Sequence, residues 1–173
     1  MEVILLGSST LKIKGKKASL VVDPKKGVPK QEAVAILLLN KSEFDPSRVS
    51  EHRVIIAEPG EYEVSGIKMS VNTNHRGIFY SLNVDNLDMV LANTSTLSSF
   101  TDKITGPQVA ILNVDSEFDA EAIAAIEPRV VLLYGENSES AIKSLGKMGV
   151  MPSKKISYTS DKLPEETQIV WLA

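Results

Sequence analysis

The sequence predicts an α+β fold in which helices cover the outside of stacked β-sheets. The first ninety residues contain short apolar runs separated by turn residues at regular intervals, which is typical of strands. After residue 108 the pattern changes to strands that alternate with helices. No internal repeat, low-complexity segment or Gly/Ser/Pro-rich linker divides the chain, so we expect a single domain over residues 1–173.

The first half of the chain is predicted to form eight strands. Before Gly15, Leu11 and Ile13 alternate with Lys12 and Lys14, as in a hairpin that has one buried face and one solvated face. The first strand pair should therefore be antiparallel. The predicted strands cover residues 3–6, 11–13, 20–22, 34–38, 54–56, 67–71, 78–84 and 89–91.

The second half is predicted to contain two helices between strands. Asp119 precedes an apolar helical run and can cap its free N–H groups, while Pro128 and Gly149 follow the two helices as stop signals. The predicted order is strand 109–112, helix 119–126, strand 130–133, helix 139–148 and a last strand over 168–172.

Composition narrows the class of protein. A chain of 173 residues with 43% hydrophobic residues is long enough for a sizeable core. Its net charge of -3 argues against a general affinity for nucleic acid, and the lack of cysteine excludes disulfides and thiolate metal sites. No apolar run is long enough for a signal peptide or a membrane span, so we expect a cytoplasmic protein that does not enter the membrane.

Four segments resemble one known family. Residues 7–13 followed by 20–24 resemble the Gly-His turn, hairpin and Asp-Pro strand that open the metallo-β-lactamase superfamily. Residues 58–64, 127–133 and 163–167 resemble, in the same order, later segments of its lactonase-like branch, the branch of L-ascorbate-6-phosphate lactonase. The resemblance spans nearly the whole chain and implies a four-layer αββα sandwich.

The resemblance also implies a metal site, and the matching residues depart from it. Active members of the family bind one or two metal ions through a His-x-His-x-Asp-His motif at a strand end, where this chain reads Asn40-Lys41-Ser42-Glu43-Phe44-Asp45. Further ligand positions become Ser8, Asn93-Thr94 and Gly135. A metal site needs converging imidazoles or carboxylates, and a lysine ammonium repels the ion, so we expect no metal and no other cofactor. The expected vestigial cleft comprises Ser8, Asn40, Lys41, Ser42, Asp45, Asn93, Thr94 and Gly135, with no catalytic residue assigned.

Other candidate ligands favour structural interpretations. His52 and His75 have no acidic or imidazole partner at metal spacing and are expected in solvated loops. Asp115, Glu117 and Asp119 alternate after a strand and could surround Mg²⁺ or Ca²⁺, but the glycine of a known calcium loop is missing and Asp119 is needed as a cap.

Three further features of the sequence bear on function. Glu61 and Glu63 on one strand face are interpreted as structural, because the resemblance places this segment in active and inactive relatives alike. The hydroxyl-rich loop 93–99 could bind a small anion, but it lacks a Gly-x-Ser-x-Gly elbow, so ordinary turn capping is favoured. The chain also has neither of the glycine-rich nucleotide-binding motifs.

Lysines are concentrated in the first thirty residues. They could contact RNA phosphates, but few aromatic side chains accompany them, and lysines also protect edge hairpins from aggregation. Nucleic acid is therefore a disfavoured partner. The lysines are Lys12, Lys14, Lys16, Lys17, Lys25, Lys26 and Lys30.

The sequence leads to one main functional hypothesis and two alternatives. The main hypothesis is a non-catalytic protein with a binding, scaffolding or subunit-interaction role, whose partner is another protein or a second copy of the chain. The first alternative is a hydrolase with a rebuilt site that uses Lys41, Glu43, Asp45 and the Ser/Thr loop. The second is RNA binding through the lysine hairpin.

Overall fold

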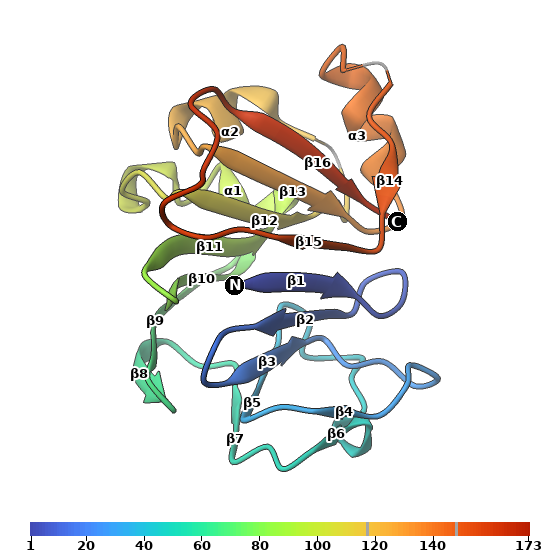
Figure 1. Cartoon of the computed structure of the whole chain (residues 1–173), viewed down its shortest axis with the longest axis vertical. Helices are drawn as coiled ribbons and strands as arrows, with labels where there is room; N and C mark the ends of the chain where they lie inside the picture. The colour runs from blue at the N-terminus through green and yellow to red at the C-terminus, as the bar shows by residue number, and fades with distance from the viewer. Residues whose placement is uncertain (117, 148) are drawn as a thin grey trace.

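The computed structural model describes residues 1–116, 118–147 and 149–173 and shows two β-sheets packed face to face (Figure 1). The first sheet has the order β15-β1-β2-β3-β5-β7. Its strands are β1 (Glu2–Leu5), β2 (Leu11–Lys14), β3 (Ser19–Val22), β5 (Ala35–Leu37), β7 (Val54–Ile56) and β15 (Lys155–Ser157). Strands β1 to β3 are antiparallel, as the hairpin pattern predicts, whereas β3, β5 and β7 are parallel.

The second sheet has eight strands in the order β14-β16-β13-β12-β11-β10-β9-β8. The strands from β8 to β11 are antiparallel, and β11, β12, β13 and β16 are parallel. The bounds are β8 (Gly60–Val64), β9 (Ile67–Asn74), β10 (Gly77–Val84), β11 (Leu87–Asn93), β12 (Val109–Asn113), β13 (Val130–Tyr134), β14 (Pro152–Ser153) and β16 (Gln168–Leu172).

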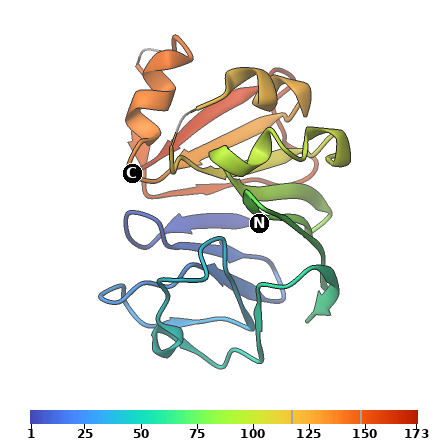
Figure 2. The same ribbon diagram turned by 180° about the vertical axis from the view of Figure 1, so that it is seen from behind.

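Helices cover the outer face of the eight-stranded sheet. Figures 1 and 2 show α1 (Thr94–Leu97), α2 (Ala120–Ala125) and α3 (Ser138–Ser144) together on one side of the molecule. Over the six-stranded sheet lie a small sheet of β4 (Gln31–Glu32) with β6 (Val49–Ser50) and the 3-10 turn η1 (Pro46–Arg48). A second 3-10 turn, η2 (Thr101–Lys103), follows α1. The predicted α+β sandwich is confirmed.

Helix α2 follows both of its predicted signals, whereas α3 is shorter than predicted. The carboxylate of Asp119 accepts hydrogen bonds from the N–H groups of Glu121 and Ala122, which confirms its capping role for α2. Helix α3 ends at Ser144, so the prediction that this helix extends to residue 148 was wrong. Met148 itself lies outside the described residues. Gly146, at φ +66°, ends this segment, because glycine adopts the left-handed conformation without steric cost.

Alternating strand residues separate the core into layers. Inward-facing residues of both sheets, such as Val3, Ile13, Met69 and Leu132, form the central cluster. The opposite faces of β10 to β13 pack against the helices, and Val21, Ile36 and Leu38 pack beneath the β4–β6 layer. Burial of apolar side chains on both faces explains why these strands have nearly continuous apolar sequences.

The hydroxyl of Tyr80 links the two sheets. Tyr80 lies in β10 and is fully buried. Its hydroxyl accepts a hydrogen bond from the Leu38 N–H at 3.0 Å and lies 2.7 Å from the Leu38 carbonyl oxygen and 2.8 Å from that of Ile56. Burial raises the pKa of Tyr80, so the hydroxyl stays protonated and can donate.

We expect Tyr80→Phe to lower the free energy of unfolding by about 2 kcal/mol, because it removes the buried hydrogen bonds between this hydroxyl and the backbone of Leu38 and Ile56. The Leu38 N–H keeps a second acceptor, the Ile56 carbonyl oxygen at 3.2 Å. Urea denaturation measures the change. A suitable control is Tyr158→Phe, which removes a hydroxyl bonded only to the side chain of Gln168 at 2.8 Å and should cost less. Equal losses in the two variants would contradict the linking role of Tyr80.

Candidate functional site

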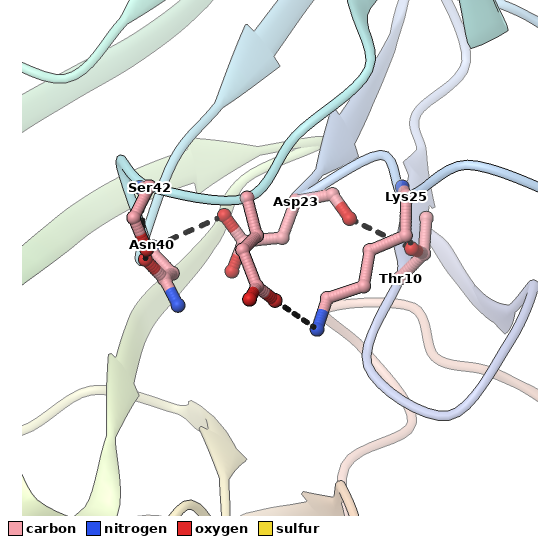
Figure 3. A network of polar contacts seen from close by, with 6 residues as sticks. Thr10, Asp23, Lys25, Asn40 and Ser42 are labelled. Atoms are coloured by element: carbon pink, nitrogen blue, oxygen red, sulfur yellow. Dashed lines mark hydrogen bonds and ion pairs between the residues drawn. The ribbon is translucent and has the colours of Figure 1, made fainter.

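Asp23 is a buried carboxylate at the end of β3, only 3% exposed. Its Oδ1 accepts hydrogen bonds from the backbone N–H groups of Leu39 at 2.9 Å and Asn40 at 3.2 Å. The Thr10 hydroxyl donates to the Asp23 carbonyl oxygen at 2.7 Å, so three segments meet at this residue (Figure 3). Asp23 therefore fixes the chain that follows β5, where the sequence places the vestigial motif.

The environment of Asp23 favours its protonated form. Burial raises the pKa of this carboxyl from 3.8 to about 6, against the hydrogen bonds from Asn40 and Leu39 and the charge of Lys25, which lower it. The backbone of Asp23 has φ +43°, a conformation that aspartate and asparagine tolerate better than most residues. The Asp-Pro pair at a strand end was the sequence signal for this residue, but sequence reasoning used it only as a mark of the family.

The residues of the vestigial motif lie around Asp23 and have different partners. The Asn40 side chain accepts from the Ser42 N–H at 3.0 Å and from its hydroxyl at 2.7 Å. The Lys41 ammonium pairs with Glu58 at 2.7 Å, at the surface. Asp45 caps η1 by accepting from the Ser47 N–H at 3.0 Å, and the hydrogen bonds from Ser47 lower the pKa of its carboxyl. These side chains do not converge on a common point.

The ends of three parallel strands carry a second group of the predicted site residues. Asn93, Asn113 and Tyr134 are aligned at the ends of β11, β12 and β13. The Asn113 amide donates to Asn93 Oδ1 at 2.9 Å. Next to it, Gly135 has φ +98°, and a Cβ atom there would lie 2.3 Å from Asn113 Oδ1. This contact leaves space for glycine alone, and sequence reasoning had not identified Asn113.

The hydroxyl-rich segment 93–99 was predicted as a loop, but residues Thr94–Leu97 form the short helix α1, and Asp115 joins this segment to the end of β12. Its carboxylate accepts from the hydroxyl of Thr94 at 3.2 Å and from that of Ser95 at 2.6 Å, and the Ser95 N–H donates to it as well. Thr94 is buried, so its hydroxyl is used for structure. Of the three carboxylates considered as a cation site, Asp115 binds the loop, Asp119 caps α2, and Glu117 lies outside the described residues.

Two buried hydroxyls lie near the site without a partner. Among the described residues, neither the Tyr134 hydroxyl nor the Ser9 hydroxyl has a hydrogen-bond partner. Complete burial raises the pKa of Tyr134 well above its ordinary value, and the negative charges of Asp23 and Asp115 raise it further. Tyr134 is thus a neutral group that lies within the electrostatic reach of both carboxylates.

A pocket of about 390 Å³ adjoins these residues. Ser8 and Gly135 line it together, so the structure brings two widely separated members of the predicted cleft to one place. The remaining lining residues are Leu5, Leu6, Gly7, Glu136, Lys154, Leu172 and Ala173. The pocket has a mostly apolar wall with charged residues at its rim.

The other predicted candidates lie elsewhere. His52 hydrogen-bonds to the Val49 carbonyl oxygen at 2.7 Å, and His75 lies in the exposed turn between β9 and β10. Glu61 and Glu63 are exposed on β8, and Lys12 and Lys14 lie on the first hairpin. In the part of the chain that the structure describes, no three His, Cys, Asp or Glu side chains are close enough to hold a metal ion. Nor does that part contain a helix with the length and apolarity needed to cross a membrane.

Comparison with solved structures identifies the fold. No protein-family model and no curated protein matches this sequence. A metallo-β-lactamase superfamily protein from Thermotoga maritima superposes with a TM-score of 0.78 at 13% identity, covering 99% of this chain and 97% of that one. The chain has the metallo-β-lactamase fold. The fold is shared with isothiocyanate hydrolase from Delia radicum gut bacteria, with a TM-score of 0.54, 9% identity and coverage of 92% and 100%.

Zinc-bound PqqB from Methylobacterium extorquens is also similar, with a TM-score of 0.52, 11% identity and coverage of 84% and 96%. The metallo-β-lactamase fold thus occurs in a zinc protein, and the polar residues described at the strand ends here do not fit such an ion. Zinc sites in proteins use imidazole, thiolate and carboxylate ligands. Here Asn93 and Asn113 bind each other, Lys41 is a cation, and Asp23 accepts two backbone N–H groups.

Proposed function

We propose that this protein is a non-catalytic protein of the metallo-β-lactamase fold that acts in the cytoplasm by binding or subunit interaction. The resemblance of residues 58–64 to the lactonase-like branch supports a relationship to that branch. The proposal depends on the residues that stand where the resemblance implies metal ligands. Polar groups at these strand ends, such as Asn93 and Asn113, are bonded to one another and are not free to bind an ion.

The contact between Gly135 and Asn113 is the observation that carries the proposal. The resemblance implies a histidine near position 135, whereas a side chain at Gly135 would meet Asn113 Oδ1 at 2.3 Å and the backbone of Val114 at 3.3 Å. Asn113 is held in place by its hydrogen bond to Asn93. Restoring a ligand would therefore require the ends of β12 and β13 to move apart or Asn113 to give up its bond to Asn93.

The rival proposal, a rebuilt hydrolase site, is favoured by one observation. The hydroxyl of Ser95 lies 2.6 Å from the carboxylate of Asp115, and a serine beside a base is a common nucleophile arrangement. A carboxylate is a weak base for a serine hydroxyl, however, and the hydrogen bonds of the described residues include none between a histidine and this pair. Lys41, Glu43 and Asp45 also have partners outside such a site, namely Glu58, Lys25 and Ser47.

Metal content tests the proposal directly. We expect protein purified without an affinity tag, incubated with Zn²⁺, Mn²⁺ and Fe²⁺ and then desalted, to retain less than about a tenth of an equivalent of each metal by elemental mass spectrometry. The control is an Asn40→His/Ser42→His variant, which restores two imidazoles but not the closed position at Gly135. Retention of one equivalent by the unmodified protein would refute the proposal.

A hydrolase screen gives an independent test. Lactones, phosphodiesters and thioesters should be turned over no faster by the protein than by a Ser95→Ala variant. Turnover that Ser95→Ala or Lys41→Ala abolishes, while Ser98→Ala leaves it intact, would establish the rebuilt hydrolase instead. Ser98 is a suitable control because it is an exposed hydroxyl of the same loop.

A further inference from the structure

The two sheets have four edge strands, and three of them carry residues that oppose strand pairing. Strand β14 contains Pro152, which lacks a donor, and β15 carries the exposed Lys155. Strand β8 carries Glu61 and Glu63, both exposed. Proline and charged side chains are the usual means by which sheet edges avoid adding another strand.

The fourth edge strand, β7, carries no such residue within its own bounds, and the exposed Arg53 directly precedes it. The strand reads Val54-Ile55-Ile56, with no charge and no proline. Ile55 is 40% exposed and is one of two large apolar side chains exposed in the described part of the chain, with Met151 as the other. An uncharged apolar edge is a template for another strand.

Ile55 also extends an apolar surface that is already present. It is aligned with Ile36 of β5, which packs in the outer cluster with Val21 and Leu38. Ala57, two residues after Ile55 on the same face, packs against that cluster too. A strand added beside β7 would cover the exposed part of Ile55 and continue this cluster.

We propose that β7 pairs with β7 of a second copy of this chain, which joins the two six-stranded sheets into one continuous sheet. A twofold axis requires the two strands to run antiparallel, because each must present the same edge to the other. Centred on Ile55, this register places Ile55 opposite its own copy and Val54 opposite Ile56. All three pairs are apolar and β-branched, and such residues are favoured in strands.

Polar groups at the ends of the strand pair support a second copy as the occupant. The same register places His52 opposite Glu58, twice by symmetry, so that the imidazole can donate to a carboxylate that also pairs with Lys41. The Nδ1 atom of His52 is engaged with the Val49 carbonyl oxygen, so the other ring nitrogen is the one directed away from that contact. By contrast, self-pairing of β8 around Tyr62 would place Glu61 opposite Glu63, twice, which is unfavourable.

This inference rests on the proposed interaction role and names its partner. A three-residue strand pair buries less surface than a permanent interface, so the dimer is reversible, with a Kd on the order of 10–100 μM. Because association is measured hydrodynamically, it fails or succeeds independently of the metal and hydrolase assays. A monomer without metal would leave the proposed function standing and remove only this inference.

Sedimentation velocity from about 1 μM to 1 mM protein tests the pairing. We expect a monomer–dimer equilibrium, and Ile55→Lys should weaken it by about 30-fold or more, because two ammonium groups would face each other across the axis. The matched control is Met151→Lys, at a side chain that is 80% exposed and remote from β7 in the sheet order, and it should leave the Kd unchanged.

A second variant tests the register. His52→Glu places two carboxylates opposite each other and should raise the Kd about 10-fold, and the effect should shrink at high salt. A monomer at all concentrations, a dimer that Ile55→Lys leaves intact, or equal effects of Ile55→Lys and Met151→Lys would each overturn the proposal. So would a finding that β7 pairs with a different protein while this chain stays monomeric.

Discussion

Between pH 4 and pH 7, an Asp23→Asn variant should gain about 2.5 kcal/mol of stability relative to the unmodified protein. Asp23 has a folded-state pKa of about 6, compared with an ordinary value of 3.8. A shift of about two pKa units corresponds to about 3 kcal/mol. Asparagine can accept the same backbone hydrogen bonds from Leu39 and Asn40 without a buried charge.

The direction of the pH dependence follows from the raised pKa of Asp23. Because the folded state holds the proton more tightly than the unfolded chain, the favourable contribution of Asp23 is complete below about pH 4 and is lost as pH rises through about 6. Other carboxylates shift in the opposite direction, including Asp45, whose pKa is lowered by its hydrogen bonds from Ser47. The difference between variant and unmodified protein cancels these contributions, so it isolates Asp23.

Urea denaturation at pH 4, 5, 6 and 7 measures this difference. Asp23→Ala is the control, because it removes the buried acceptor together with the charge and places alanine at φ +43°. It should be less stable than Asp23→Asn by about 2–4 kcal/mol at every pH. A difference between asparagine variant and unmodified protein that does not change with pH would contradict the buried, raised-pKa carboxyl.

Gly135→Ala should lower the free energy of unfolding by about 3–5 kcal/mol. The new Cβ would lie 2.3 Å from Asn113 Oδ1, and the backbone at φ +98° strains any residue other than glycine. Both costs arise where β12 and β13 end, so the strand ends must separate or Asn113 must lose its bond to Asn93. Thermal or urea denaturation gives the change.

Gly66→Ala separates the two costs. Gly66 has φ +82° but no atom within 4 Å of an added Cβ, so alanine there should cost about 1 kcal/mol from backbone strain alone. Adding Asn113→Ala to Gly135→Ala should remove the steric clash. The double variant should therefore lose less free energy of unfolding than the sum of the losses in the two single variants. If Gly135→Ala proved as mild as Gly66→Ala, the argument for a closed ligand position would fail.

The candidate site was only partly predictable. Ser8 and Gly135 were expected in one cleft and do line one pocket, because both follow strands that end at the same edge of the sandwich. Lys41 and Asp45 were expected in the same cleft, but the structure directs them to Glu58 and to the turn η1. Side-chain direction in a loop depends on neighbours that are remote in sequence, and spacing along the chain does not reveal them.

The sequence by itself determined eleven of the sixteen described strands, the capped helix α2 and the α+β class, because propensity, alternation and residue identity are local properties. It did not predict the strands β4, β6, β8, β14 and β15 or the helix α1. Tertiary structure alone decided that Asp23 is buried, that Asn113 closes the space beside Gly135, and that β7 is an uncharged apolar edge. Each of these depends on which distant segments pack together, and the long-range pairing of strands sets that arrangement.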